Sequence, residues 1–250
     1  MAKTDLEPTK IIPIRQNIYQ IRAIKPGSHV YLVKGANKNM LVDTGVVTKF
    51  PVLKGCLGEV GLEPEDIDLV VLTHEHVDHA GAAIFFSNSA IIAAHRNAAN
   101  KIELQDEFVT LQRFRGWRTA PLKVDLWLEE GNYIDLGDYQ LCVIHTPGHT
   151  SGCVCLYEPS EKLLFSGDTV FAGGILSEIG PSGNISDYMQ SIQRLNTLRI
   201  EELYPGHGMI SRIPEEDMRR ALEYALSLFE DSKLLFQAMG IKKKGILKPE

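Results

Sequence analysis

Histidine and aspartate residues are concentrated in one short segment, His74-Glu75-His76-Val77-Asp78-His79. The chain has eight histidines, and three of them lie in this segment. Imidazole and carboxylate groups are ligands that suit Zn²⁺, Fe²⁺ or Mn²⁺. Four such groups within six residues are hard to explain as ordinary solvated surface. The segment therefore predicts a metal site.

Three further segments share one pattern, in which a predicted strand ends in a glycine-containing turn that carries a histidine or an aspartate. These turns are 146–152 with His149, 166–169 with Asp168, and 204–208 with His207. Glycine lets the backbone turn sharply, so one side chain from each turn can point into a shared space. We therefore expect these three residues to join the first cluster.

Short strands with turn residues between them are expected to position these segments. The predicted strands cover 11–14, 18–23, 30–33, 40–42, 67–72, 90–94, 123–128, 133–136, 140–145, 153–157, 163–165 and 201–204. Helical spacing of apolar residues predicts helices over 49–60, 97–104, 186–198 and 214–239. The stretch 105–121 mixes aromatic and charged residues and is predicted as a flap or a partly helical segment.

The domain organisation follows from length and composition. The chain has 250 residues, of which 44% are hydrophobic and 23% charged, and these values argue against disorder. No Pro/Gly/Ser-rich linker divides it, so we expect one domain over 1–250, with helix 214–239 packed on it and a loose tail at 240–250. Segments 30–45 and 153–169 each read as strand, turn, strand and then an Asp beside a Gly, which suggests two similar halves.

The charge and hydropathy of the chain disfavour nucleic-acid and membrane partners. The net charge of −6 disfavours a broad nucleic-acid-binding surface. No run of about 18 apolar residues exists, so no membrane span is expected. The polar N-terminus lacks the apolar stretch of a secretory signal. The four cysteines form no C-x-x-C and are expected to be reduced, which predicts a cytoplasmic protein.

Four motifs in this chain resemble those of the metallo-β-lactamase fold superfamily of hydrolases. They are T-H-E-H-V-D-H-A-G, H-T-P-G-H-T-S-G, S-G-D-T and P-G-H-G, and L-V-D-T-G at 41–45 resembles the first motif of that family. The similarity extends from about residue 11 to about residue 210. It implies an α+β fold, an αββα sandwich of two similar halves. The region after His207 is short in this chain and is essentially one helix.

Carried over by position, the resemblance implies seven ligands for two divalent metal ions, with Zn expected and Fe or Mn as alternatives. Asp43 would orient the ligand loop through hydrogen bonds, although a plain turn residue is the alternative. Glu75 and Val77 would face between the ligands without binding metal. The first ion would be held by His74, His76 and His149, the second by Asp78, His79 and His207, and Asp168 would bridge them.

Two such ions would lower the pKa of a shared water and supply a metal-bound hydroxide as the nucleophile. Asp78 would be the catalytic residue that also accepts or shuttles the proton. No serine or cysteine nucleophile is required. The expected reaction is therefore hydrolysis, with one metal polarising the scissile carbonyl or phosphoryl oxygen.

Among the branches of the superfamily, glyoxalase II-like thioester hydrolases and related lactonases are the most similar, which implies a small thioester, ester or lactone substrate. The stretch 171–180 lacks the Gly-Cys-Gly-Arg-like segment of glyoxalase II and of persulfide dioxygenases. Three alternatives stay open. One is a mononuclear iron persulfide dioxygenase-like enzyme using His74, His149 and Asp168, another is a compact endoribonuclease or phosphodiesterase, and the third is a non-catalytic metal-binding protein. The oligomeric state is open, a homodimer included.

Two segments are expected to flank the metals as a pocket wall or lid, namely 108–117 and 171–183. Tyr188 is either a polar contact there or part of a packed helix face. His145, at a strand end, could support the site or play a structural part. His29 and His95 carry no motif and are expected to have no role in the site.

Overall fold

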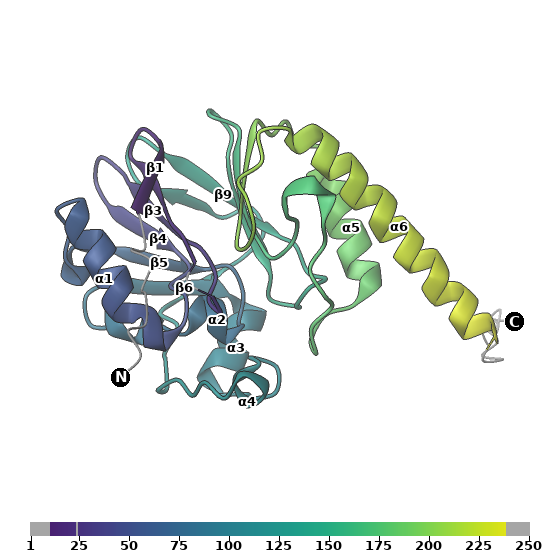
Figure 1. Cartoon of the computed structure of the whole chain (residues 1–250), viewed down its shortest axis with the longest axis horizontal. Helices are drawn as coiled ribbons and strands as arrows, with labels where there is room; N and C mark the ends of the chain where they lie inside the picture. Colours follow the sequence, from purple (N-terminus) through teal and green to yellow (C-terminus); the bar gives the residue numbers. More distant parts are fainter. Residues whose placement is uncertain (1–10, 24, 239–250) are drawn as a thin grey trace, which may run out of the picture.

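Two β-sheets lie face to face, with helices on the outer side of each sheet (Figure 1). A computed structural model gives this arrangement for residues 11–23 and 25–238. The order of layers is helix, sheet, sheet, helix, so the expected αββα fold is confirmed. The tail 240–250, expected to be loose, and residue 239 of the last predicted helix lie outside the described residues.

The first sheet has seven strands in sequence order. From β4 onward neighbouring strands are parallel, so their carboxyl ends meet at one edge of the sheet. The segments that follow β4 and β5 therefore emerge side by side. The strands are β1 (Ile11–Arg15), β2 (Ile18–Ile21), β3 (Val30–Lys34), β4 (Asn39–Val42), β5 (Leu69–Leu72), β6 (Ile91–His95) and β7 (Leu126–Leu128).

The second sheet has five strands in the order β12-β11-β10-β9-β8. Strands β11 and β12 are parallel, and the other neighbours are antiparallel. The turns after β11 and β12 therefore leave the sheet at the same edge. The strands are β8 (Tyr133–Asp135), β9 (Gln140–His145), β10 (Val154–Glu158), β11 (Leu163–Gly167) and β12 (Glu202–Pro205).

Helices cover both outer faces. Helices α1 and α3 pack on the first sheet, whereas α5 and the first part of α6 pack on the second (Figure 1). The α-helices are α1 (Phe50–Glu59), α2 (Val77–Ala80), α3 (Arg96–Glu103), α4 (Gln112–Arg115), α5 (Ile185–Leu195) and α6 (Pro214–Ala238). Single 3-10 turns are η1 (Val47–Lys49), η2 (Pro64–Asp66), η3 (Ala83–Phe86) and η4 (Ala172–Gly174).

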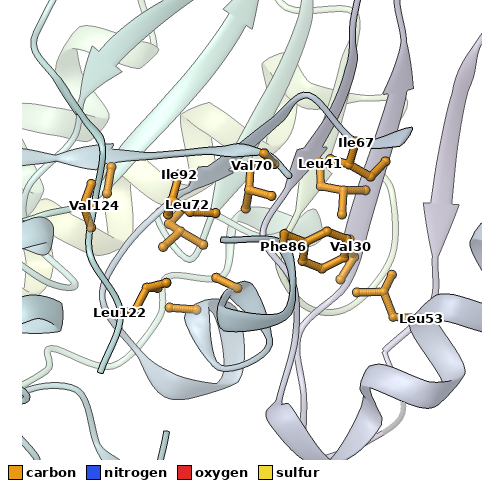
Figure 2. Packing of buried hydrophobic residues seen from close by; sticks show 14 of the residues in the cluster. Val30, Leu41, Leu53, Ile67, Val70, Leu72, Phe86, Ile92, Leu122 and Val124 are labelled. Carbon is orange, nitrogen blue, oxygen red and sulfur yellow. The ribbon is translucent and has the colours of Figure 1, made fainter. Parts of the chain in front are cut away.

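Alternating side chains of each central strand fill two different cores. Leu41 and Val70 pack toward the helices with Leu53 of α1 and Phe86, as Figure 2 shows. Their neighbour Val71 lies in the cluster between the two sheets. A strand covered on both faces reads as a continuous apolar run, which explains the I-D-L-V-V-L pattern at 67–72.

The repeated strand-turn-strand unit is present twice. Strands β3 and β4 form one antiparallel pair and β10 and β11 form the other, and Asp43 and Asp168 follow them. In each pair, an aspartate thus follows the carboxyl end of the second strand.

Some predicted elements are shorter than expected. Strand β7 begins at Leu126 rather than at residue 123, because the Asp125 carboxylate accepts the Ile92 N–H at 3.1 Å in place of a ladder carbonyl. The 105–121 stretch holds only the single turn α4, bounded by Leu111 and Gly116 in the left-handed conformation, which stops a helix at both ends. The helix predicted over 186–198 ends at Leu195.

Candidate metal centre

The seven predicted ligands lie together at the edge where both sheets end. Four different turns supply them, and each turn follows a strand: β5, β9, β11 and β12. Strand ends are rigid positions, since backbone hydrogen bonds and both cores hold them. The side chains grouped there are His74, His76, Asp78, His79, His149, Asp168 and His207.

Helix α2 explains how one short segment offers four groups. His76 has an extended backbone and immediately precedes the helix, and Asp78 and His79 lie in its first turn. The chain therefore leaves β5 extended and then folds back by one turn. This change of conformation brings His79 within a 4.1 Å ring-centroid distance of His74.

Two glycines allow the turns that carry His149 and His207 to approach neighbouring residues closely. Gly148 has a φ of +152°, and a Cβ there would lie 2.4 Å from the Cα of Tyr188. Gly206 sits directly beside the cluster, where a Cβ would lie 2.5 Å from Asp168 Oδ1. Any side chain at these positions would displace neighbouring atoms, so glycine is required for the close approach.

One group of ligand atoms combines His74, His76 and His149. Nε2 of His149 lies 3.0 Å from Nδ1 of His76, and the rings of His74 and His149 are 5.0 Å apart at their centroids. One potential ligand atom from each residue lies within 4.8 Å of the others. Three buried imidazoles at this spacing could hold a metal ion.

A second group combines Asp78, His79 and His207. Nε2 of His207 lies 3.3 Å from Nε2 of His79 and 3.4 Å from Asp78 Oδ2. Asp168 lies between the two groups, with Oδ1 3.2 Å from Nε2 of His79 and Oδ2 3.8 Å from Nε2 of His149. Its carboxylate is thus placed to contact ions in both groups.

Hydrogen bonds on the far side of the rings fix which nitrogen faces the centre. Nδ1 of His79 faces Asp43 Oδ2 at 2.7 Å, and Nδ1 of His149 faces the Glu178 carbonyl. These oxygens can only accept, so both Nδ1 atoms carry the proton. Nε2 of each ring then presents its lone pair to the centre, as a metal ligand requires.

Asp43 also organises the ligand turn itself. Its carboxylate accepts the backbone N–H and the hydroxyl of Thr73, both at 2.8 Å, and Thr73 Oγ1 lies 3.1 Å from Nδ1 of His74. The hydrogen bonds expected of Asp43 are therefore present, so it is more than a plain turn residue. Its effect on metal binding stays a prediction.

The buried polar atoms of the centre fit a cation. Among the described residues, His74 Nε2 and His76 Nε2 are buried without a hydrogen-bond partner. Buried acceptors without partners are costly, and several converging lone pairs repel one another. A divalent cation would satisfy them together, so the donor set matches the implied metals.

The pKa values of the cluster favour metal-binding protonation states. Burial lowers the pKa of His74 well below its usual value and that of His76 to about 3. Burial alone would raise the pKa of Asp78, but the His207 hydrogen bond and the charges of His79 and His207 together lower that pKa to about 2. Neutral imidazoles and ionised carboxylates are the forms that bind divalent ions.

His79 behaves differently from the other imidazoles. Burial disfavours its charged form, yet Asp168 and Asp43 on either side raise its pKa well above the usual value. Without a metal, this ring therefore carries the positive charge between two carboxylates. A proton and a metal ion compete for the same nitrogen.

A cleft of about 600 Å³ opens above the cluster. Apolar side chains on its walls are Leu111, Phe171 and Ile179, and cationic side chains are Lys25 and Arg115. Segments 108–117 and 171–183 thus both contribute to the walls, as expected. The cluster residues exposed to the cleft are His76, Asp78, His149, Asp168 and His207.

Other residues considered from the sequence lie outside the cleft lining. Tyr188 is buried, and its hydroxyl accepts from the Ser177 N–H and donates to the Thr169 carbonyl, both at 2.8 Å, so the packing interpretation holds. His145 faces the Ser151 carbonyl at 3.0 Å and stacks on His95. His145 thus contacts the turn that carries His149 through the Ser151 carbonyl.

His29 is a residue that sequence reasoning missed. Its Nε2 lies 2.8 Å from the Gly208 carbonyl, and its backbone N–H donates to the Gly206 carbonyl at 2.7 Å. It therefore holds both sides of the turn that carries His207. No motif surrounds His29, so only the pairing of distant segments could have indicated this contact.

Two simpler expectations concern the rest of the chain. All four cysteines are free thiols, and only Cys142 is not buried. Within residues 11–23 and 25–238, no helix has both the length and the apolar character needed to cross a membrane.

Comparison with known proteins agrees with the motifs. Residues 25–207 match the family described as Metallo-beta-lactamase superfamily. The chain is 34% identical over 201 residues to "Acyl-coenzyme A thioesterase MBLAC2" of Gallus gallus, covering 72% of both chains. It is 30% identical over 161 residues to "Hydroxyacylglutathione hydrolase GloC" of Haemophilus influenzae, covering 61% of this chain and 76% of that one.

A solved structure points the same way. TTHA1623 in a di-iron-bound form has a TM-score of 0.65 and 28% identity to this chain, covering 78% of this chain and 94% of that one. Fold, motifs and sequence identity therefore agree, and the chain belongs to the metallo-β-lactamase superfamily.

Proposed function

We propose that this chain is a dinuclear metal-dependent hydrolase that cleaves thioesters. The observation that carries the proposal is the convergence of seven histidine and aspartate side chains at the base of one cleft. The relatives named as a thioesterase and as a hydroxyacylglutathione hydrolase favour a thioester over an oxygen ester or a lactone.

In this proposal the two groups of ligands hold one divalent ion each. Zn is the expected metal and Fe or Mn are the alternatives, because all three accept imidazole and carboxylate ligands. The first ion is assigned to His74, His76 and His149, the second to Asp78, His79 and His207, and Asp168 is shared by both.

When bound, the two ions would supply an acidified water as nucleophile and a Lewis acid for the thioester carbonyl. The protein's own part is to keep the ligands fixed and in the right tautomer. Asp43 and the Glu178 carbonyl do this for His79 and His149. Asp78 is ionised at neutral pH and lines the cleft, so its carboxylate could accept a proton there when the metals are bound.

The cleft walls favour a substrate with an anionic part and an apolar part. Both Lys25 and Arg115 line the cleft, and the Arg115 guanidinium lies 5.7 Å from the Trp117 ring centroid, an arrangement that leaves its charge to face a phosphate or carboxylate. Phe171 and Ile179 offer apolar surface for an acyl chain. A thioester of a negatively charged thiol such as coenzyme A combines both features.

Metal analysis combined with a substrate panel tests the proposal. The protein is loaded separately with Zn, Fe or Mn, and its metal content is measured by mass spectrometry. Each form is then assayed on coenzyme A and glutathione thioesters, a lactone and bis(p-nitrophenyl) phosphate. Oxygen uptake with a persulfide is measured with an oxygen electrode. We expect close to two ions per chain and the highest kcat/KM on a thioester. Faster phosphodiester cleavage, oxygen uptake with the persulfide, or two bound ions without any thioester turnover would overturn it.

A further inference from the structure

Glu75, the residue between His74 and His76, has a completely buried side chain whose partners are not ligand side chains. Its Oε2 accepts the Thr150 hydroxyl at 2.8 Å, and its Oε1 accepts the Ser182 hydroxyl at 2.9 Å. The ammonium group of Lys101 lies 3.1 Å from Oε1. A buried carboxylate is therefore surrounded by three donors from three different segments.

Lys101 extends this network to helix α3. Its ammonium group donates to Ser151 Oγ at 2.6 Å and to the Asn97 carbonyl at 2.8 Å, in addition to contacting Glu75. An ammonium group has three protons, so all its donors are used. The Asn97 amide also donates to the Ser151 carbonyl at 3.1 Å. Helix α3 is thus fastened to the His149 turn.

The partners of Glu75 belong to the parts of the site that must be held at fixed separations. Thr150 and Ser151 directly follow the predicted ligand His149. Ser182 directly follows the cleft-lining residues 177–181, and the Gly180 N–H there donates to the His149 carbonyl at 2.8 Å. One carboxylate therefore connects the turn of His74 and His76, the turn of His149 and the wall 178–183.

We infer that Glu75 is a positioning residue, whose carboxylate sets the separation of the two ligand-bearing turns and fixes the cleft wall against them. Hydrogen bonds to a charged group are stronger than neutral ones, especially where water is excluded. A neutral side chain could not balance the Lys101 charge and accept from both hydroxyls. The kinetic consequence of this role rests on the proposed thioesterase function, whereas the positional role does not.

Hydrogen–deuterium exchange of Glu75→Gln tests the positional role without any assay of turnover. In metal-free and metal-loaded protein, we expect amides in 148–152 and 178–184 to exchange at least tenfold faster than in the unmodified chain. Glu63→Gln is the matched control, because Glu63 forms an exposed ion pair with Lys54 at 3.2 Å, away from the cleft. Unchanged exchange in both segments would overturn the inference.

Single-contact variants keep the test decisive if Glu75→Gln does not fold. Ser182→Ala removes the hydroxyl that donates to Glu75 at 2.9 Å and accepts the Ser151 N–H at 3.2 Å. Faster exchange is therefore expected in 178–184 and at the Ser151 amide, and KM should rise at least threefold with kcat within twofold. Lys101→Met should give faster exchange in 148–152. Unchanged exchange in 178–184 with Ser182→Ala, or unchanged exchange in 148–152 with Lys101→Met, would contradict the inference. Absence of thioester turnover in the unmodified chain would reject the proposed function and leave these exchange results interpretable.

Discussion

Nε2 of His79 and Nε2 of His207 lie 3.3 Å apart, although the two residues are 128 positions apart in the chain. His79 belongs to the turn after β5 in the first sheet, and His207 to the turn after β12 in the second. Their contact therefore joins the two halves of the sandwich. In the proposed centre it also defines the second metal position, together with Asp78.

Removing His207 should empty that second position selectively. We expect His207→Ala to bind about one ion per chain instead of two, because His74, His76 and His149 are untouched. Loss of an ion that contributes several kcal/mol to the transition state should lower kcat/KM by about 100-fold or more. Metal analysis after exhaustive dialysis measures the first effect. Two tightly held ions in this variant would show that His207 is not a ligand.

Asp43→Asn should weaken metal binding without removing a ligand. An asparagine has only one oxygen, so its amide nitrogen would face either the Thr73 N–H, or the Thr73 hydroxyl together with Nδ1 of His79. All three of these groups need an acceptor, so the support of the ligand turn is weakened in either orientation. Loss of such supporting contacts lowers metal affinity by about 10- to 100-fold. Asp43 has a φ of +61°, which asparagine tolerates, so the backbone should stay in place.

Asp68→Asn is the control for this substitution, since Asp68 Oδ2 accepts the Asn39 N–H at 2.7 Å on the same pair of strands. Competition with a chelator of known affinity measures the metal affinity of both variants. Equal affinities for the two would mean that Asp43 does not orient the ligands.

Neutralising the cleft cations should affect charged substrates only. Lys25→Gln and Arg115→Gln should each raise KM for a coenzyme A thioester by about two- to fivefold, as exposed ion pairs contribute about 1 kcal/mol or less. KM for an uncharged thioester should not change, and added salt should reduce the difference between substrates. Arg113→Gln is the control, because Arg113 is exposed on the same α4 turn and does not line the cleft. An equal rise in KM for the charged and the uncharged thioester would show that these cations do not recognise the charge of the substrate.

His95 should make the metal-free protein less stable in acid. Burial, with a smaller effect of His145, lowers its pKa from 6.5 to about 4 in the folded chain. As the pH falls below 6.5 the unfolded chain gains a proton that the folded chain does not, so the free energy of unfolding decreases until about pH 4. We expect a loss of about 2 kcal/mol from pH 7 to pH 5 from this residue.

His95→Asn should remove this contribution. Nδ1 of His95 accepts the Asn97 N–H at 3.2 Å at the start of α3, and an asparagine oxygen can replace that cap. Urea unfolding at several pH values should therefore give a flatter dependence on pH for the variant. Parallel curves for the two proteins would contradict the assignment.

Local patterns in the sequence were enough to predict most strands and the residues of the centre. Alternating apolar residues indicate a strand buried on one face, and continuous apolar runs indicate a strand buried on both faces. Glycines mark turns whose backbone conformation other residues rarely adopt. Both signals can be recognised in a short stretch of sequence. The weakly patterned 105–121 stretch was predicted only as a flap or a partly helical segment, and its single turn of helix agrees with that. The sequence could not give the turn's position, because it depends on left-handed residues at Leu111 and Gly116 and on contacts with the cleft.

The sequence by itself determined which residue types could bind metal, their order along the chain and the fold class. Only the tertiary structure decided which atoms meet. Examples are the His29 contact with the Gly208 carbonyl, the hydrogen bonds by which Asp43 and the Glu178 carbonyl orient two histidine rings, and the hydrogen bonds around Glu75. These depend on distances between segments that are far apart in sequence. A hydrogen bond forms only when donor and acceptor come within about 3 Å, and no local pattern encodes that distance.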